Sequence, residues 1–347
     1  MFPEAPIYTS LYRKEGMEAF HDADIRTSFL QKIPGAVNHH QWYLMLLPYV
    51  FEQFNLDAYD IVISSSHACS KGIITKPTTL HVCYCHSPMR YVWDSWREYI
   101  DQYHFPSVLK PFIFWCLHDM RLWDRLAAQR VDKYMTNSEF VRGRIQKYYW
   151  SDAKVIYPPV DVDCFTPSKK YFSPSKEDYF LAVGRLVPYK RFDLLVDAFN
   201  ISGLPLKICG TGSEMNRLKQ CAKKNISFLG NVSDAELVIL YSRCKAFLFP
   251  QCEDFGIAPL EAMSCGRPVI AYGKGGALET IVRNKTGIFF QEQTVESLLD
   301  ALNRFSQMKF DATTIRKHAL TFGPNHFEKA FLSALSRFWD DFAREKL

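Results

Sequence analysis

The sequence predicts an α/β protein built from two domains, each with a parallel β-sheet. Its 347 residues are enough to form two hydrophobic cores. Short apolar runs alternate with amphipathic helical patterns, as in βαβ units whose sheet is covered on both faces. Residues 157–178 are rich in Pro, Ser and charge without a sustained period, which indicates a linker. We therefore expect two Rossmann-like domains facing each other across a cleft.

The second half of the chain has the more regular alternation. The expected helix at 192–200, for example, places Phe192, Leu195 and Phe199 on one face. We expect strands at 179–184, 204–210, 226–230, 246–250, 268–273 and 287–290. The helices between them are expected at 192–200, 214–224, 234–244, 259–265 and 277–282.

The first half is less regular, and its elements are expected from shorter patterns. Strands are expected at 6–11, 59–66, 79–85, 133–138 and 154–158, with the largest helix at about 107–131. A last helix covers 325–346. The expected division is an N-terminal domain at 1–160, a C-terminal domain at 161–325, and a helix at 326–347 that packs back on the N-terminal domain.

Composition excludes several classes of protein. The net charge of +5 is far below what a nucleic-acid-binding surface needs, so we expect no nucleic-acid partner. Ten cysteines without paired spacing read as reduced thiols in a cytoplasmic protein. The N-terminus has no pattern of a signal peptide. The longest central apolar run, residues 111–117, is much shorter than the roughly 20 residues that cross a bilayer.

Loops that follow expected strands carry the candidate functional residues, because open parallel sheets bind ligands beyond the carboxyl ends of their strands. "GRLVPYKR" (184–191) places Arg185 and Lys190 before a helix N-terminus, where two cations are unfavourable unless an anion lies between them. The alternative is two solvated charges in a surface loop. "CGTGSE" (209–214) and "YGKGGALE" (272–279) are glycine-rich and allow close backbone approach, but neither has the full dinucleotide fingerprint.

The stretch "EDFGIAPLE" (253–261) carries a carboxylate on each side of a strand-to-helix turn. Pro259 fits the first helical position, so Glu261 is expected in the first turn, where an acid is favourable without any ligand. That explanation does not cover Glu253, which precedes the turn. Two carboxylates and free backbone amides suit a ligand with hydroxyls and a diphosphate, as in a nucleotide sugar.

At this point the chain resembles a known family. "EDFGIAPLE", "GRLVPYKR" and "NSEFVRGRI…VIYPPVDVDCF" look like a family 4 glycosyltransferase of the GT-B type, and "HVCYCHSPMRYVWD" (81–94) resembles bacterial mannosyltransferases of O-antigen (lipopolysaccharide) or exopolysaccharide synthesis. The resemblance implies that Glu253 contacts the transferred sugar, that Glu261 binds the ribose diol, and that Arg185 and Lys190 hold the diphosphate. It also implies donor contacts at Gly184, Gly210, Gly212, Val232, Phe255, Gly256, Ile257 and Ala258.

His86, in "CYCHSP", ends an expected strand. From the residues alone it reads as a satisfied polar side chain at a strand terminus. The resemblance instead implies a functional His beside the donor sugar and the acceptor. The neighbouring His81, Cys83 and Cys85 share one strand face, but a zinc site needs about four ligands and no second cluster completes it. We expect no metal site and no obligatory cofactor.

The aromatic and basic stretch at 90–130 has two interpretations. Trp and Phe usually belong to cores, so we favour helical packing inside the N-terminal domain. The alternative is contact with the inner face of the cell membrane, where Trp, Lys and Arg favour the interface. A lipid-linked acceptor, which the resemblance implies, would make such contact useful.

The chain departs from the family pattern at its start. The family has a strand, a glycine-rich loop and a helix before the segment that matches "APIYTSLY". The first strand of a doubly wound sheet is central, and without it two strand edges stay unpaired. We therefore expect a sequence shortened at its N-terminus.

The functional expectation is a retaining glycosyltransferase that moves a hexose, with mannose from GDP-mannose as the favoured donor, to a glycan or lipid-linked oligosaccharide. A nucleotide-sugar epimerase or hydrolase of the same fold is one alternative. An inactive, N-terminally truncated nucleotide-sugar-binding protein is the other.

Overall fold

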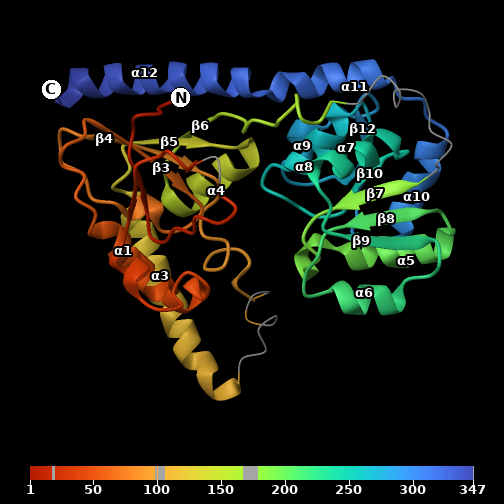
Figure 1. Ribbon diagram of the computed structural model, residues 1–347, viewed down its shortest axis with the longest axis horizontal. Helices are drawn as coiled ribbons and strands as arrows, with labels where there is room; N and C mark the ends of the chain where they lie inside the picture. Colours follow the sequence, from red (N-terminus) through yellow and green to blue (C-terminus); the bar gives the residue numbers. More distant parts are fainter. Residues whose placement is uncertain (18–19, 98–99, 101–105, 167–178, 347) are drawn as a thin grey trace. The chain divides into compact units, whose positions relative to one another are not determined.

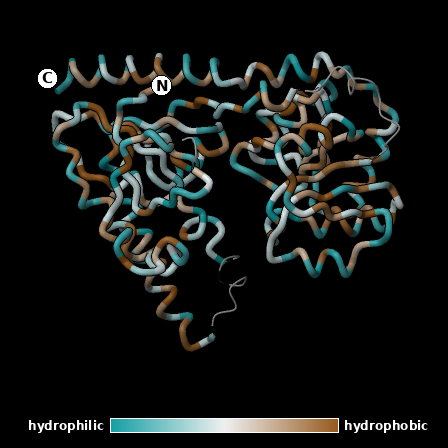
Figure 2. The backbone as a smooth tube through the Cα atoms, in the orientation of Figure 1, coloured by the Kyte–Doolittle hydropathy of each residue, from teal (hydrophilic) through white to brown (hydrophobic). Residues whose placement is uncertain are grey.

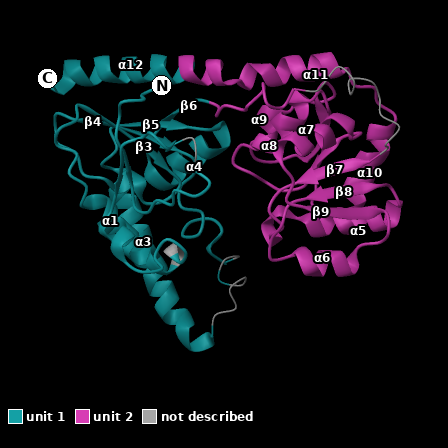
Figure 3. Cartoon of the chain, in the orientation of Figure 1, with its two compact units in different colours: residues 1–156, 330–347 teal, residues 157–329 magenta. Residues whose placement is uncertain are grey.

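The chain forms two α/β units, coloured separately in Figure 3. The computed structural model describes residues 1–17, 20–97, 100, 106–166 and 179–346. Unit 1 contains residues 1–156 and 330–347, and unit 2 contains residues 157–329. Of the linker expected at 157–178, residues 167–178 lie outside the described part of the chain.

Unit 2 contains a six-stranded parallel sheet of order β12-β11-β10-β7-β8-β9 (Figure 1). Its strands are β7 (Phe180–Val183), β8 (Leu206–Cys209), β9 (Ile226–Gly230), β10 (Phe247–Phe249), β11 (Val269–Tyr272) and β12 (Gly287–Phe290). Strands β7, β8 and β9 follow one another toward one edge of the sheet. The next strand, β10, lies on the other side of β7, where Phe247 pairs with Leu181. The strand order therefore reverses between β7 and β10, which is where such sheets bind ligands.

Helices cover both faces of this sheet. They are α5 (Phe192–Ser202), α6 (Met215–Cys221), α7 (Asp234–Arg243), α8 (Ile257–Ser264), α9 (Ala277–Thr280), α10 (Val295–Ser306) and α11 (Ala312–Ala319). Successive residues of β7 enter different cores: Leu181 packs with residues of α7, α8 and α11, whereas Ala182 packs with residues of α5 and α10. Burial on both faces explains why these strands read as continuous apolar runs.

Unit 1 contains two separate parallel sheets among the residues that the structure describes. The four-stranded sheet consists of β3 (Ile61–Ser66), β4 (Leu80–Cys85), β5 (Lys133–Thr136) and β6 (Ala153–Val155), in that order. The other pairs β1 (Ile7–Thr9) with β2 (Ile25–Thr27), a strand that the sequence pattern did not predict. The family pattern also predicts a central strand that comes before β1 in the sequence, and this strand stays a prediction.

The α-helices that the structure describes within unit 1 include α1 (Leu47–Glu52), α3 (Lys110–Ala128) and α4 (Glu139–Tyr149). The last helix, α12 (Pro324–Lys346), begins in unit 2, and its residues from Ala330 onward belong to unit 1. In that part the Phe331 ring centroid lies 6.3 Å from that of Tyr84, and Lys346 Nζ lies 3.0 Å from Asp132 Oδ1. No helix among the described residues is long and apolar enough to span a bilayer.

The prediction that the aromatic stretch is core is wrong for the first half of α3. Phe112 is 62% exposed and Trp115 is 60% exposed, and Phe114 is exposed as well. The buried residues of α3 all lie in its second half. The period of the pattern predicted the helix correctly, but a period does not reveal whether another element covers an apolar face. Residues 98–99 and 101–105 of the stretch lie outside the described residues.

The second half of α3 is fixed to unit 1 by a buried ion pair. Asp124, on α3, is fully buried and pairs with the ammonium of Lys71, whose side chain is 1% exposed. The other Asp124 oxygen accepts hydrogen bonds from Trp93 Nε1 at 2.7 Å and from the Tyr149 hydroxyl at 2.9 Å. Lys71 also donates to the Ala68 carbonyl at 2.8 Å, so both charges have several partners.

Candidate functional site

Two loops at the carboxyl edge of the unit 2 sheet meet where the strand order reverses. One follows β7 and carries Lys190, and the other follows β10 and carries Glu253. Lys190 Nζ lies 2.5 Å from Glu253 Oε1, and the two side chains are only 19% and 18% exposed. The structure thus joins two predicted site residues that are far apart in the sequence.

The ion pair changes the interpretation of the basic loop after β7. The anion that balances Lys190 here is a carboxylate of the protein itself. Arg185 lies in the same loop and is exposed. The helix that follows begins at Phe192, and its N-terminus is complemented by Asp193, which contacts Arg191 Nε at 3.2 Å.

Glu261 lies deeper in its helix than the sequence predicted. The helix α8 begins at Ile257 and not at Pro259, because Gly256 takes a left-handed φ of +94° and serves as the N-cap. Glu261 is therefore outside the first turn, and a helix-dipole role does not explain it. Its Oε2 accepts a hydrogen bond from the buried Tyr241 hydroxyl at 2.9 Å.

Burial raises the pKa of Glu261, the Tyr241 hydrogen bond acts in the opposite direction, and the charge of Asp234 adds to the rise. Tyr241 is a site residue that the sequence analysis missed. A tyrosine on the buried face of a helix needs a hydrogen-bond partner for its hydroxyl, and this requirement could have pointed to Tyr241 in the sequence. Because Tyr241 uses Oε2, the other oxygen of Glu261 is left to accept from a ligand.

Gly210 and Gly212 are needed for packing of the loop after β8 against the loop after β7. A Cβ at Gly210 would lie 2.0 Å from the Gly184 carbonyl oxygen, and one at Gly212 would lie 2.2 Å from that of Leu186. Backbone hydrogen bonds connect the same loops, from the Leu186 amide to Thr211 and from the Glu214 amide to Leu186. The close approach that these glycines allow is therefore made by the protein's own backbone.

The glycines after β11 pack in the same way against the loop that carries Glu253. The Gly276 amide donates to the Glu253 carbonyl at 2.9 Å. A Cβ at Gly276 would lie 2.3 Å from Phe255 Cα, and one at Gly275 would lie 2.4 Å from the Glu253 carbonyl oxygen. The backbone around Glu253 is thus fixed by a neighbouring loop.

We expect Gly276→Ala to destabilise unit 2 by about 1–3 kcal/mol, because the added methyl group overpacks rigid backbone. Calorimetric unfolding measures the change. The matched control is Gly143→Ala in α4, where a Cβ meets nothing within 4 Å. That exposed helical position should gain about 0.5–1 kcal/mol. Equal effects of the two substitutions would contradict the packing role of Gly276.

The other residues predicted to contact the donor differ in the solvent exposure of their side chains. Ile257 is exposed, whereas Val232 and Ala258 are half-buried and pack against the apolar core. The Phe255 side chain is buried and stacks on Tyr157 with ring centroids 5.6 Å apart. Phe255 therefore has only its backbone to offer a ligand.

His86 belongs to unit 1, whereas the other predicted catalytic residues belong to unit 2. It follows β4 directly, and its Nε2 lies 2.8 Å from Ser65 Oγ at the carboxyl end of β3. Its backbone is fixed on both sides, because the His86 amide donates to Ser66 and the His86 carbonyl accepts from Asn137. Ser65 was not predicted; a serine run ending the neighbouring strand was the only sign of it.

His81, Cys83 and Cys85 are fully buried. His81 Nε2 lies 2.9 Å from Ser64 Oγ, and burial lowers the pKa of His81 to about 4, so this imidazole is neutral at pH 7. Among the described residues, no group of three or more His, Cys, Asp or Glu side chains could hold a metal ion.

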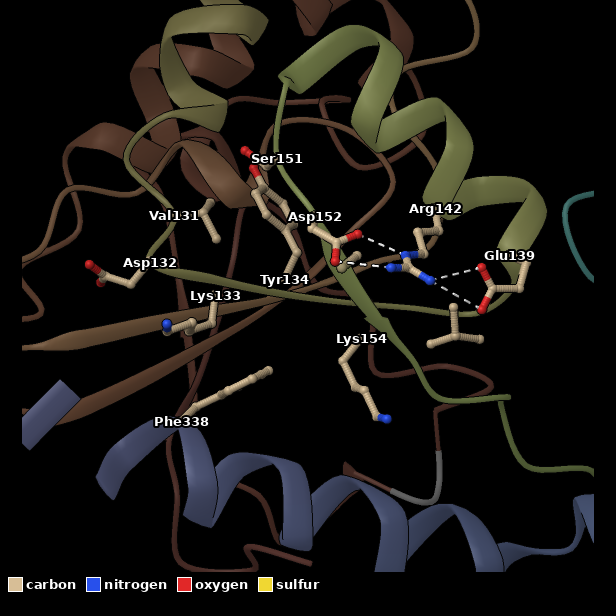
Figure 4. A pocket seen from close by; sticks show the side chains of 12 residues that line it. Val131, Asp132, Lys133, Tyr134, Glu139, Arg142, Ser151, Asp152, Lys154 and Phe338 are labelled. Atoms are coloured by element: carbon tan, nitrogen blue, oxygen red, sulfur yellow. Dashed lines mark hydrogen bonds and ion pairs between the residues drawn. The ribbon is translucent and has the colours of Figure 1, made fainter. Parts of the chain in front are cut away.

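Unit 1 contains a hollow of about 550 Å³, shown in Figure 4, near the amino ends of strands β5 and β6. Lys133 and Ala153, the first residues of β5 and β6, line it, so it is not at the carboxyl ends of the strands. Its acids and bases are largely paired: Arg142 binds both Asp152 and Glu139. The Arg142 hydrogen bond lowers the pKa of Asp152 to about 2. This hollow therefore lacks the features of the candidate site.

Comparison with known proteins finds similarity in the second unit. Residues 166–321 match the family of glycosyl transferases group 1. The O-antigen chain mannosyltransferase RfbU of Salmonella typhimurium is 30% identical over 206 residues, which cover 52% of this chain and 56% of RfbU. The GDP-mannose-dependent alpha-(1-6)-phosphatidylinositol monomannoside mannosyltransferase of Mycobacterium tuberculosis is 30% identical over 192 residues, 48% of this chain and 50% of that protein. The chain thus spans about half the length of these curated relatives.

Solved structures identify the fold of the whole chain. Sucrose-phosphate synthase from Thermosynechococcus elongatus superposes with a TM-score of 0.72 at 16% identity, covering 91% of this chain and 84% of that chain. Anabaena HepE in complex with UDP and glucose gives a TM-score of 0.63 at 17% identity, covering 92% and 87%. The chain has the GT-B fold, and residues 166–321 match the glycosyl transferases group 1 family.

Proposed function

We propose that the protein is a retaining glycosyltransferase that transfers mannose from GDP-mannose to a glycan or a lipid-linked oligosaccharide. The observation that carries the proposal is the Lys190–Glu253 pair at the strand reversal of unit 2. The names of the mannosyltransferases that match support the choice of donor. No metal is required in this proposal.

In this proposal, each site residue of unit 2 contacts a different part of the donor. An ammonium has three donor hydrogens, so Lys190 can keep Glu253 and still bind a diphosphate oxygen. Together with Arg185 it stabilises the charge that develops on the departing nucleoside diphosphate. Glu253, held by Lys190, accepts from hydroxyls of the transferred sugar, and the free oxygen of Glu261 accepts from the ribose diol. In unit 1, His86 is the histidine that this proposal assigns to the reaction.

Donor affinity should fall at acidic pH through Glu261. Its pKa is raised, so it takes up a proton at higher pH than an ordinary glutamate, whose pKa is about 4.3. Protonation removes the negative charge that attracts the ribose hydroxyls, so Kd for GDP-mannose rises as pH decreases through the raised pKa. Titration calorimetry across this range measures the change. Glu261→Gln should bind weakly at every pH, and the same pH dependence in that variant would exclude Glu261 as its source.

A thermal-shift panel of GDP-, UDP- and ADP-sugars tests the donor. A ligand that binds only the folded state stabilises it by about 2.7 kcal/mol at a hundred times its Kd. We expect GDP-mannose to raise Tm most. A larger shift with a UDP-sugar would overturn the choice of guanine, and no shift with any sugar nucleotide would overturn nucleotide-sugar binding.

Turnover tests the reaction. The protein is incubated with GDP-mannose alone and with GDP-mannose plus a panel of mannosylated lipid and glycan acceptors. We expect a mannosylated product only with an acceptor, and its anomeric proton in NMR should show the configuration of the donor. Isomerised donor in the sample without acceptor would instead identify an epimerase, and free mannose would identify a hydrolase.

A further inference from the structure

The outer half of α3 is an apolar surface that the described part of unit 1 leaves uncovered. Figure 1 shows α3 running away from the sheet of unit 1, and Figure 2 shows that much of this outer part is hydrophobic. We define this tip by its exposed apolar residues. They are Phe112, Phe114 and Trp115 of α3, together with Val108 and Leu109 of the short 3-10 helix (Ser107–Leu109) that leads into α3.

Arginines beside the tip and further along α3 stack on tryptophans. Trp96 packs edge-on against Phe114 with ring centroids 5.8 Å apart, and the guanidinium groups of Arg97 and Arg121 lie 4.7 and 5.4 Å from the Trp96 ring centroid. Further along α3, the Arg125 guanidinium lies 3.7 Å from the ring centroid of Trp150, a residue that is 81% exposed. Tryptophan and arginine next to an apolar segment are typical of the membrane interface.

The directions of the exposed side chains distinguish a lipid surface from a protein groove. At about 100° per residue, Phe112, Phe114 and Trp115 cover roughly 160° of the helix circumference. A helix that binds a groove presents one stripe at i, i+3, i+4 and i+7. Phe114 lies outside such a stripe, so an apolar medium that contacts nearly half of the helix circumference fits this arrangement better.

We infer that the tip of α3 inserts into the interfacial region of a bilayer rich in anionic lipids. The aromatic and aliphatic side chains of the tip enter the acyl boundary, and Arg97, Arg121 and Arg125 remain at the headgroups. The buried Lys71–Asp124 pair holds the other end of α3 in unit 1, so the helix is anchored to the protein while its tip contacts lipid. The inference deepens the proposed function, because it places the protein where a lipid-linked acceptor is found.

Co-sedimentation with vesicles tests the inference without donor, acceptor or turnover, so its failure is separate from failure of the proposed function. The full chain is mixed with vesicles of phosphatidylcholine alone or with a third phosphatidylglycerol. We expect binding to the anionic vesicles that weakens as salt rises. Phe112→Ser/Trp115→Ser should lower the partition coefficient at least about tenfold, because two large apolar side chains are removed from the interface.

The matched control is Ile74→Ser/Ile201→Ser, which removes two exposed apolar side chains away from the tip and should bind as the wild type does. Equal loss in both double variants, or no binding of the wild type to either vesicle, would overturn the inference. Equal binding to neutral and anionic vesicles would overturn the role of the arginines. A wild-type dimer in solution that the Phe112→Ser/Trp115→Ser variant lacks would assign the tip to a second copy of the chain instead.

Discussion

Lys190→Ala is expected to lower kcat by about a hundredfold or more, since removal of one preformed charge contact to a developing anion typically has this effect. The variant loses the ammonium that binds the diphosphate, and it leaves the Glu253 carboxylate, 18% exposed, without its ion pair. Two functions of the site therefore fail together. Initial rates at saturating GDP-mannose measure the loss.

The control for this variant is Lys309→Ala, which removes an exposed lysine from the loop after α10. It should leave kcat unchanged. Circular dichroism and thermal unfolding show whether each variant is folded. A folded Lys190→Ala enzyme with the kcat of the wild type would remove Lys190 from the mechanism.

Asp124→Ala is expected to have the largest effect on stability. It leaves the Lys71 ammonium buried without its counter-charge and removes the acceptor of Trp93 and Tyr149. Burial alone lowers the pKa of Lys71, but the attraction of Asp124 outweighs it and the pKa is raised, so Lys71 keeps its proton in the folded protein. Breaking a buried pair from one side costs about 3–5 kcal/mol.

Calorimetric unfolding of Asp124→Ala and of Asp152→Ala compares the stability lost with a buried ion pair and with an exposed one. Asp152 pairs with Arg142 on the surface, with a side chain that is 65% exposed, and its removal should cost less than about 1 kcal/mol. A similar, small loss in both variants would show that the buried pair does not hold α3 in place.

The parts of the fold that the sequence predicted well are those with burial on both sides of a strand. Each strand of unit 2 ends within two residues of its predicted end, because a continuous apolar run marks it clearly and, in every strand but β12, glycine or proline closes the run. The start of α8 was predicted two residues late. Proline fits the first helical position, but Gly256 in a left-handed conformation already caps the helix.

The candidate site was predicted as a set of residues and not as a set of contacts. Lys190 and Glu253 were both identified, but their direct pairing depends on β10 lying next to β7, which is a property of the topology. Tyr241 and Ser65 were missed because each acts through a partner on another element. The exposure of Phe112 and Trp115 could not be predicted, since it depends on which elements leave α3 uncovered.

Hydrogen–deuterium exchange with and without GDP-mannose tests most directly whether a nucleotide sugar binds at the strand reversal of unit 2. Backbone amides at 184–191, 210–214 and 253–261 should exchange more slowly when the donor is bound, because the ligand covers these loops. Protection should be absent around the hollow lined by Lys133 and Asp152. Donor binding that slows exchange there, or elsewhere, while the three loops after β7, β8 and β10 stay unchanged would contradict the account.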